Sequence, residues 1–417
     1  MPADLYLGLD LGTSGARAVV IDASGGTLAS GKAAMADFGK NHRDPATWWK
    51  AARAALEAAL ARIDRASIRA LAVDGTSGTM LAVDGAGEPL GDALMYNDAS
   101  PDEAAVAAIG KAAPATSAAH GATSGLAKAM ALKDRKSARI VHQADWIASR
   151  FSGLLVSDAN NALKTGYDPV AARWPDWIGR LGFDTALLPE VVEPGAAIGP
   201  VTPEAAKAFG LSPQLRVVAG TTDGCASFLA TGASAPGDGV TALGTTLTLK
   251  LLSDKPIFAP EYGIYSHRIL GQWLAGGASN TGGGALLAYF TAEEMEALTP
   301  RLDPARPTGL DYYPLTRPGE RFPIADPNFA PRVEPKPADR AVFLQGLLEG
   351  VAEVEALGYR RLAELGAPQL RSVRSVGGGA KNPAWTKIRA GKLKVPMLEA
   401  TADEAAYGAA LLARAAL

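Results

Sequence analysis

Two short turns of similar composition lie far apart in the chain. Gly12-Thr13-Ser14 separates two apolar runs near the beginning, and Gly244-Thr245-Thr246 separates two more in the second half. Each pattern predicts a strand, a tight turn and a second strand. The backbone N–H groups and hydroxyls of two such turns can hold a polyanion, and a triphosphate fits that description. The alternative is that Gly12 and Gly244 only make tight turns.

The segments around these turns are alike beyond the glycines. LDLGTSGARAVVID near the beginning corresponds to TALGTTLTLKLLSD in the second half, which indicates an internal duplication. Neither turn matches the G-x-x-x-x-G-K-[ST] phosphate loop, and neither opens a helix as a dinucleotide-binding G-x-G-x-x-G does. The common ATP-binding and NAD-binding folds are therefore not indicated.

An aspartate stands at the end of the first predicted strand. Asp10 directly precedes the first turn, where an unpaired carboxylate would repel a nucleotide unless Mg²⁺ lay between them. The sequence therefore predicts that Asp10 faces a magnesium ion. In the alternative, Asp10 only accepts hydrogen bonds from its own turn.

A second aspartate stands where a strand is followed by a helix. LRVVAG at 215–220 predicts a buried strand, and an apolar helical pattern begins at Cys225. Asp223 lies between them among small residues, which let a substrate approach its carboxylate closely. We therefore expect Asp223 to be a general base. The alternative role, as a helix N-cap, is compatible with this one.

A further glycine-rich stretch, SVGGGAKNPAW, follows a predicted strand near the end of the chain. Gly378, Gly379 and Ala380, with Asn382 beyond them, would form a surface almost without side chains. A flat heterocycle such as adenine can lie against backbone of this kind. A run of glycines by itself is equally the pattern of a plain loop.

The elements that position these residues alternate between strand and helix. Residues 45–63 have apolar side chains at helical spacing, IRALAVD at 68–74 predicts a buried strand, and 341–365 predicts a long helix. This alternation predicts an α/β fold. Turn formers cluster at 235–239, and we expect the domain boundary there, with domains of residues 1–234 and 235–417.

The composition restricts the partners of the chain. With 41 Lys+Arg against 43 Asp+Glu, there is no polybasic surface for nucleic acid. No apolar run approaches the roughly 18 residues of a membrane span, and the beginning of the chain lacks the pattern of a secretory leader. The single cysteine excludes an internal disulfide. We therefore expect a cytoplasmic protein, a monomer or homodimer, with a small-molecule partner.

Taken together, the motifs resemble the FGGY family of carbohydrate kinases, within the actin-like ATPase superfamily. The resemblance runs the length of the chain and rests on Asp10 to Ser14, Gly220 to Asp223, Gly244 to Thr246 and Gly377 to Asn382. It implies two actin-like (ribonuclease H-like) α/β domains with a deep interdomain cleft, ATP and Mg²⁺ as cofactors, and a small sugar as substrate. It also implies that Asp223 is the catalytic base.

Within that family the chain looks most like the short cyanobacterial and plastid-type kinases assigned to D-ribulose. The similarity is carried by DGTSGT, QADW, SDANNALKTGYDP, GLDYYPL and GERFPIADP. Thr76 to Thr79 stand where glycerol kinases of the family have an Arg-Glu pair and many xylulokinases have Gln-Met-His-Gly. The resemblance implies phosphorylation of D-ribulose to D-ribulose 5-phosphate. D-Xylulose, ribitol and erythritol stay open as alternatives.

Four side chains are expected to contact the sugar. Asp223 accepts the proton of the terminal hydroxyl as its oxygen attacks the γ-phosphorus, and Asp10 lies beside the metal. Ser77, with Asp98, reads the other hydroxyls. Ser77 follows the end of a buried strand, where the backbone is well determined; alternatively it is an ordinary turn serine that bonds to its own backbone.

Two other classes of protein would use related turns. An actin-like or chaperone-like ATPase would share the nucleotide turns, but it has no use for Asp223 as a base and needs a polymer interface or a peptide-binding domain in addition. A sugar sensor with a helix-turn-helix would need a DNA-binding segment ahead of the first strand and a basic surface. We expect neither.

Overall fold

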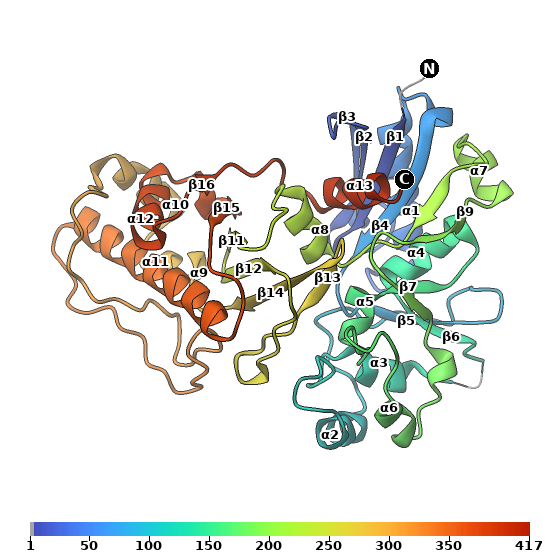
Figure 1. Ribbon diagram of the computed structural model, residues 1–417, viewed down its shortest axis with the longest axis horizontal. Coiled ribbons are helices and arrows are strands. Elements are labelled where there is room, and N and C mark those ends of the chain that lie inside the picture. The colour runs from blue at the N-terminus through green and yellow to red at the C-terminus, as the bar shows by residue number, and fades with distance from the viewer. Residues whose placement is uncertain (1–3, 135) are drawn as a thin grey trace. The chain divides into compact units, whose positions relative to one another are not determined.

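The computed structural model describes residues 4–134 and 136–417, which form two compact units (Figure 1). The first unit contains the chain up to Ala230, together with His267–Gly271 and Glu404–Leu417, and the second contains Thr231–Ser266 and Gln272–Asp403. The division is therefore more interleaved than the single boundary expected between residues 234 and 235. Two late segments complete the first unit.

The large sheet of the first unit has six strands in the described part of the chain, in the order β3-β2-β1-β4-β10-β9. β1 pairs with β4 and β4 with β10 in parallel, and the other pairs are antiparallel. The hairpin predicted around the first turn is the pair β1 and β2. The bounds are β1 Leu5–Leu11, β2 Gly15–Asp22, β3 Thr27–Ala34, β4 Ile68–Gly75, β9 Ala197–Pro200 and β10 Arg216–Val218.

Helices cover both faces of this sheet. α1 (Pro45–Leu60) begins where the sequence predicted, with Pro45 in its first turn and Asp44 as N-cap, and it packs on β1, β2 and β3. α13 (Ala405–Ala415) packs on β1, β2 and β4. Successive strand side chains point to opposite faces: Leu7 and Leu9 pack into the core cluster that includes α1, whereas Gly8 faces Ala406 of α13.

Smaller elements complete the first unit. β5 pairs with β6 antiparallel, and β7 with β8 in parallel. The bounds are β5 Met80–Val83, β6 Arg139–His142, β7 Val156–Asp158, β8 Glu190–Val192, β13 His267–Ile269, α2 Glu103–Ala112, α3 Gly125–Leu132, α4 Gln143–Ser152, α5 Ala159–Leu163, α6 Asp176–Arg180, α7 Pro203–Phe209 and α8 Asp223–Ala230.

The second unit repeats the arrangement at the centre of the first. β14, β12, β11, β15 and β16 lie side by side in this order. β11 and β12 form the second predicted hairpin, and β11 pairs in parallel with β15, as β1 does with β4. The bounds are β11 Asp238–Leu243, β12 Leu247–Ser253, β14 Gln272–Ala278, β15 Ser372–Val376, β16 Met397–Leu398, α9 Gly283–Leu287, α10 Ala292–Leu298, α11 Arg340–Glu364 and α12 Pro383–Leu393.

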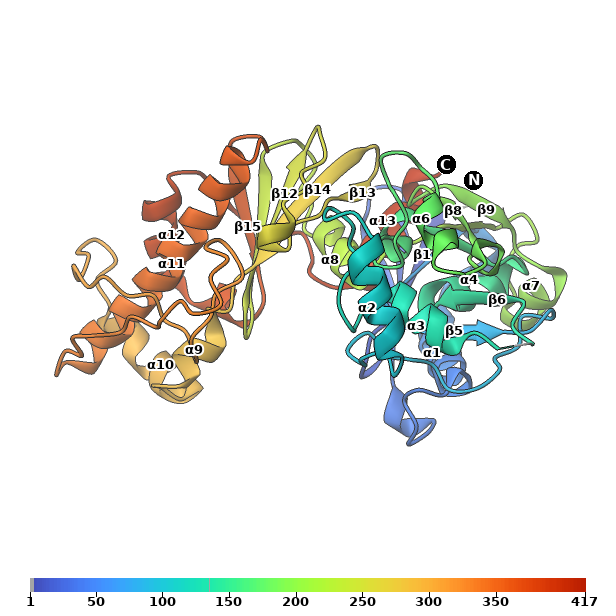
Figure 2. The ribbon, with the colours of Figure 1, turned by 90° about the horizontal axis from the view of Figure 1, so that it is seen from below.

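The core of the second unit forms between its sheet and α11. Leu344, Leu347 and Val351 of this helix pack in one cluster with Leu249 and Leu251 of β12. α12 lies beside α11, as Figure 2 shows. The long helix is within one residue of the range 341–365 predicted from the sequence. Among the described residues, no helix combines the length and the apolar character needed to cross a membrane.

Glycines let α13 approach its neighbours closely. A Cβ on Gly8 of β1 would lie 2.0 Å from the backbone oxygen of Ala406, and a Cβ on Gly408 would lie 1.8 Å from that of Ala226 in α8. Neither contact is sterically possible, so both positions need glycine as long as the backbones stay this close. The C-terminal helix is therefore held against β1 and α8 at backbone distance.

Gly408→Ala is expected to destabilise the first unit by about 1–3 kcal/mol, because α13 must move away from α8 to make room for the methyl group. Gly391→Ala in α12 is the matched control: its Cβ would meet nothing within 4 Å, so it should be neutral or stabilising by about 0.5–1 kcal/mol. Urea-unfolding midpoints measure both. Equal midpoints for the two variants would contradict the packing of α13.

Candidate active site

The first turn lies at the end of the β1–β2 hairpin with its side chains available. The N–H of Gly12 donates to the backbone oxygen of Gly15 at 3.0 Å, and Thr13 and Ser14 are exposed. A Cβ on Gly12 would have its nearest neighbour at 3.6 Å, an ordinary contact. The fold therefore does not require glycine here, which leaves close approach of a ligand to the backbone as the reason for it.

Three charged side chains meet beside this turn because of strand register. Asp10 is opposite Arg17 on β2 and opposite Asp74 on β4. Arg17 Nη1 donates to Asp10 Oδ2 at 3.1 Å, and Asp10 and Asp74 are both buried. Asp10 therefore pairs with a guanidinium on one side and lies against a second carboxyl group on the other. The sequence did not predict a role for Arg17 or Asp74.

Asp74 has an unusual electrostatic environment. Among the described residues, neither of its carboxyl oxygens accepts a hydrogen bond. Burial raises the pKa of Asp74 well above its ordinary value, and the neighbouring charges of Asp10 and Asp223 raise it further. These effects favour the protonated form, which can donate a hydrogen bond to the Asp10 carboxylate.

Asp223 completes the group of acids. It is the first residue of α8, directly after Thr222, which bridges to Gly75 at the end of β4. Its Oδ1 accepts a hydrogen bond from the N–H of Gly224 at 2.6 Å. The helix N-terminus stabilises a negative charge at this position. The structure thus brings Asp10 and Asp223, which are far apart in sequence, to the same end of the sheet.

The loop that leads to Asp223 is held from behind by Asn160 of α5. Its Nδ2 donates to Thr221 Oγ1 at 2.8 Å and to the backbone oxygen of Arg268 at 2.6 Å, and its Oδ1 accepts the N–H of Arg268 at 2.8 Å. Asn160 and Thr221 are both buried. Asn160 therefore ties the Thr221–Asp223 loop to β13.

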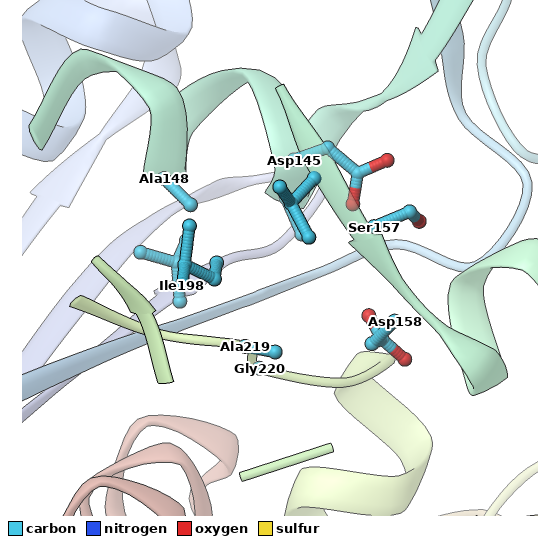
Figure 3. A pocket seen from close by; sticks show the side chains of 10 residues that line it. Asp145, Ala148, Ser157, Asp158, Ile198, Ala219 and Gly220 are labelled. Carbon is cyan, nitrogen blue, oxygen red and sulfur yellow. The ribbon is translucent and has the colours of Figure 1, made fainter. Parts of the chain in front are cut away.

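A cavity of about 10 Å³ lies behind the same loop, against Ala219 and Gly220 (Figure 3). The side chains of Asp145 and Asp158 lie on its other side. Burial raises the pKa of Asp158 to about 6, and the charge of Asp145 adds to the effect. A cavity of this volume is at the lower limit for holding a single water molecule, so it is too small for a sugar.

Ser77 and Asp98, the other predicted sugar contacts, lie on neighbouring loops of the first unit. Ser77 is half-buried in the turn after β4. Asp98 accepts two hydrogen bonds from Arg43, at 2.7 and 3.0 Å, and a third from the N–H of Met95 at 2.8 Å. The bonds from Arg43 are the largest influence that lowers the pKa of Asp98. Asp98 therefore has a loop-holding role that the sequence did not reveal.

The second unit contains a cavity of about 800 Å³ that brings together five of the ten predicted nucleotide residues. Gly244 and Thr245 of the second turn line it, as do Gly378, Gly379 and Asn382. Thr246 and Ala380, which the sequence also assigned to the nucleotide, are not among its lining residues. The sequence missed the apolar part of the lining, which includes Leu286, Met295, Leu344, Leu348, Pro383 and Trp385.

The three parts of the glycine-rich segment have different roles in this cavity. A Cβ on Gly378 would meet nothing within 4 Å, whereas one on Gly379 would lie 2.5 Å from Trp385. Asn382 caps α12 by accepting the N–H of Trp385 at 3.0 Å, and it donates to Thr299 at 3.0 Å. Gly378 thus leaves room for a ligand, while Gly379 and Asn382 shape the wall.

The second turn is supported by glycines that sequence analysis left without a role. The N–H groups of Gly283 and Gly284 at the start of α9 donate to the backbone oxygens of Gly244 and Thr245, at 2.8 and 2.9 Å. A Cβ on Gly283 would lie 2.8 Å from the oxygen of Gly244. Close packing against the second turn therefore explains Gly283 and Gly284.

The acids of the first unit fit a magnesium ion of the kind that nucleotides bring. No three His, Cys, Asp or Glu side chains of the described residues are arranged to hold a metal alone. Mg²⁺ at phosphates usually takes only one or two carboxylates and keeps several waters. Asp10, with a neighbouring carboxyl group that has no hydrogen-bond donor, provides such a partial ligand set.

Segments quoted for the closer resemblance mostly form buried polar networks. His142, directly before QADW, bonds to Asp145 of that segment at 2.7 Å and to Ser157 of SDANN at 3.1 Å. In GLDYYPL and GERFPIADP, Tyr313 donates to Glu320 at 2.8 Å, and Glu320 also accepts from Ser279. These contacts explain the residues structurally, without reference to a particular sugar.

An exposed Gly-Thr turn beside buried carboxyl groups, and a cavity of about 800 Å³ in the second unit, are features that phosphoryl transfer from a nucleotide would use. The N-terminal domain of the FGGY family of carbohydrate kinases matches residues 5–111, and the C-terminal domain of that family matches residues 237–417. Together these ranges cover more than half of the chain, which therefore belongs to the FGGY family of carbohydrate kinases. The predicted enzyme class, a phosphotransferase with an alcohol acceptor, is confirmed.

Relatives of this chain are named for two substrates. It is 28% identical to an autoinducer-2 kinase of Yersinia enterocolitica, over 98% of this chain and 86% of that protein. It is 30% identical to a xylulose kinase of Streptomyces rubiginosus, over 60% of this chain and 55% of that protein. Neither name singles out ribulose, so that finer prediction is not confirmed.

Solved structures confirm the α/β fold of two actin-like domains. A structure titled as a xyloylose kinase from Brucella ovis has a TM-score of 0.87 and 27% identity, and covers 99% of this chain and 90% of its own. A xylulose kinase from Bifidobacterium adolescentis has a TM-score of 0.82 at 23% identity, over 100% of this chain and 93% of its own. The second likeness concerns the fold alone.

Gly378→Val is expected to weaken ATP binding about ten-fold or more while leaving the melting temperature nearly unchanged, because this residue lines the cavity and a Cβ on it would meet no protein atom within 4 Å. Gly379→Val is the matched comparison: its side chain collides with Trp385, so it should lower the melting temperature. Isothermal titration with ATP and thermal unfolding separate the two effects. Normal ATP affinity in a folded Gly378→Val variant would remove this segment from the nucleotide site.

Proposed function

We propose that this kinase transfers the γ-phosphoryl group of ATP to the terminal hydroxyl of a pentulose, and that the pentulose is D-ribulose. The observation that carries the proposal is the position of Asp223 at the start of α8, in the same group of acids as Asp10 and beside the first phosphate turn. In this proposal Asp223 is a proton acceptor at the same end of the sheet as the backbone that would hold the transferred group.

Asp223 is the general base in this proposal. Its carboxylate accepts the proton of the attacking hydroxyl, and the N-terminus of α8 favours a negative charge at this position. Mg²⁺, when bound at Asp10, supplies positive charge beside the phosphates. Arg17 holds the Asp10 carboxylate from the other side at 3.1 Å. The second unit contributes the nucleotide cavity lined by Gly244, Thr245 and Gly378.

The choice of D-ribulose rests on Ser77 and the DGTSGT segment around it. The hydroxyl of Thr76 bonds to that of Thr79 at 2.6 Å and to Gln143 Oε1 at 2.9 Å, so the backbone on both sides of Ser77 is fixed. On a fixed backbone, the hydroxyl of Ser77 can form a hydrogen bond with a sugar hydroxyl in one orientation but not in the other. D-Xylulose, pentitols and tetritols are the alternative substrates. The name of one relative also suggests autoinducer-2 as a substrate, and the name of another again suggests xylulose.

Asp223→Asn is expected to lower kcat by about two to four orders of magnitude, the usual contribution of a general base, with ATP affinity and melting temperature close to those of the wild type. A coupled assay for ADP release measures kcat, and titration calorimetry measures ATP binding. A variant that keeps more than about a tenth of kcat would exclude Asp223 as the base.

Ser77→Ala is expected to reduce kcat/KM for D-ribulose more than for D-xylulose, which would narrow the ratio between them by about five-fold or more, since a lost hydrogen bond contributes about 1 kcal/mol or more. The wild type is first screened against both pentuloses, pentitols, glycerol and autoinducer-2. An unchanged ratio would show that Ser77 does not discriminate between the sugars. Preference of the wild type for another acceptor would refute the assignment to ribulose.

A further inference from the structure

Lys128 of α3 is a completely buried cation in the first unit. Its side-chain nitrogen donates to three backbone carbonyl oxygens, those of Gly78 at 2.8 Å, Met95 at 2.6 Å and Tyr96 at 3.1 Å. An ammonium group has three N–H donors, so each has one acceptor. All three N–H donors of the side chain are therefore occupied, and the buried ammonium group cannot reach a substrate.

The three carbonyl groups belong to the two loops that carry the proposed sugar contacts. Gly78 directly follows Ser77 in the turn after β4, and Met95 and Tyr96 precede Asp98 in the second loop. The same two loops meet once more where the N–H of Tyr96 donates to Thr79 Oγ1 at 2.9 Å. Lys128 therefore links the two loops through hydrogen bonds from the protein interior.

A buried ammonium is an unfavourable way to fill space. Burial lowers the pKa of Lys128 to about 8, with Asp98 raising it and Lys164 lowering it further. Asp98 is itself paired with Arg43, and no ion pair with Lys128 forms among the described residues. An apolar side chain would avoid the desolvation. An apolar side chain, however, could not donate hydrogen bonds, whereas the ammonium group donates one to each of three carbonyl groups.

We propose that Lys128 is a positioning residue for sugar recognition, which sets the spacing between the turn that carries Ser77 and the loop that carries Asp98. It acts through the backbone of these loops and does not touch the substrate. This inference rests on the proposed function in one respect, because it assumes that these two loops contact the sugar. The loop-fastening itself is independent of which sugar is bound.

The first test compares Lys128→Met with Arg65→Met. Arg65 also donates to a backbone oxygen, that of Phe209 at 2.9 Å, but it precedes β4 and so lies roughly 25 Å from the Ser77 end of that strand. Lys128→Met should raise the sugar KM about ten-fold and change KM for ATP less than about two-fold, because three buried hydrogen bonds are lost only on the sugar side. An unchanged sugar KM, or an equal rise in both KM values, would overturn the proposal.

The second test needs no substrate. Hydrogen–deuterium exchange of the apoprotein should show faster exchange in peptides that cover residues 76–98 in Lys128→Met, with no change in residues 223–230 and no effect of Arg65→Met on either segment. Unchanged exchange in 76–98 would refute the loop-fastening. If the wild type phosphorylates none of the polyols tested, the proposed substrate class fails, and the exchange result still decides the role of Lys128.

The wild type provides a third measurement should Lys128→Met fail to fold. A neutral amine has two N–H donors and a lone pair, so deprotonation leaves one of the three carbonyl groups without a donor. The sugar KM of the wild type should rise with a midpoint near pH 8, while KM for ATP stays flat across that midpoint. A sugar KM that stays constant from pH 7 to pH 9, in roughly the range where the charge is lost, would overturn the proposal.

Discussion

The parallel register of β1 and β4 is the constraint on which the rest of the first unit depends. It sets Asp10 directly beside Asp74, while β2 sets Arg17 on the other side. Two buried carboxyl groups with one guanidinium leave an excess of negative charge that a low-dielectric interior does not tolerate. A proton on Asp74 and a cation at the first turn both relieve this excess. Strand pairing thus decides which charged groups meet beside the first turn.

The two units use the same hairpin for different chemistry. When their sequences are aligned on the turn glycines Gly12 and Gly244, Asp10 corresponds to Ala242, which pairs with Val376 of β15. The second unit therefore has no acid at the corresponding position before its turn. Its cavity has a largely apolar lining, to which Thr245, Thr299 and Asn382 add polar groups and Glu296 and Lys381 add one charge of each sign. Such a lining suits an uncharged heterocycle, whereas the acids of the first unit suit metal, phosphate and a hydroxyl that must lose its proton.

Buried polar side chains hold the functional loops in place. Asn160 holds the loop before Asp223, Lys128 fastens the loops around Ser77, and Arg43 engages both carboxylate oxygens of Asp98. Asn160 and Lys128 are desolvated, so each needs well-directed partners to be tolerated, whereas Arg43 is partly exposed. Loops held in this way are rigid, because a movement that breaks one of these hydrogen bonds leaves a buried polar group without a partner. Recognition of a small polyol depends on such rigidity, since its hydroxyls differ only in direction.

The sequence by itself determined the α/β class, the two hairpins and the long helix, because these follow from local periodicity and short motifs. It also predicted roles for Asp10, Asp223 and the two glycine turns, which stay predictions. Only the tertiary structure decided that α13 and β13 belong to the first unit, that Asp74 lies beside Asp10, and that Asp98 is paired with Arg43. These facts depend on strand register and on contacts between segments distant in the chain. No local pattern encodes them, since packing and pairing are settled only when the whole sheet forms.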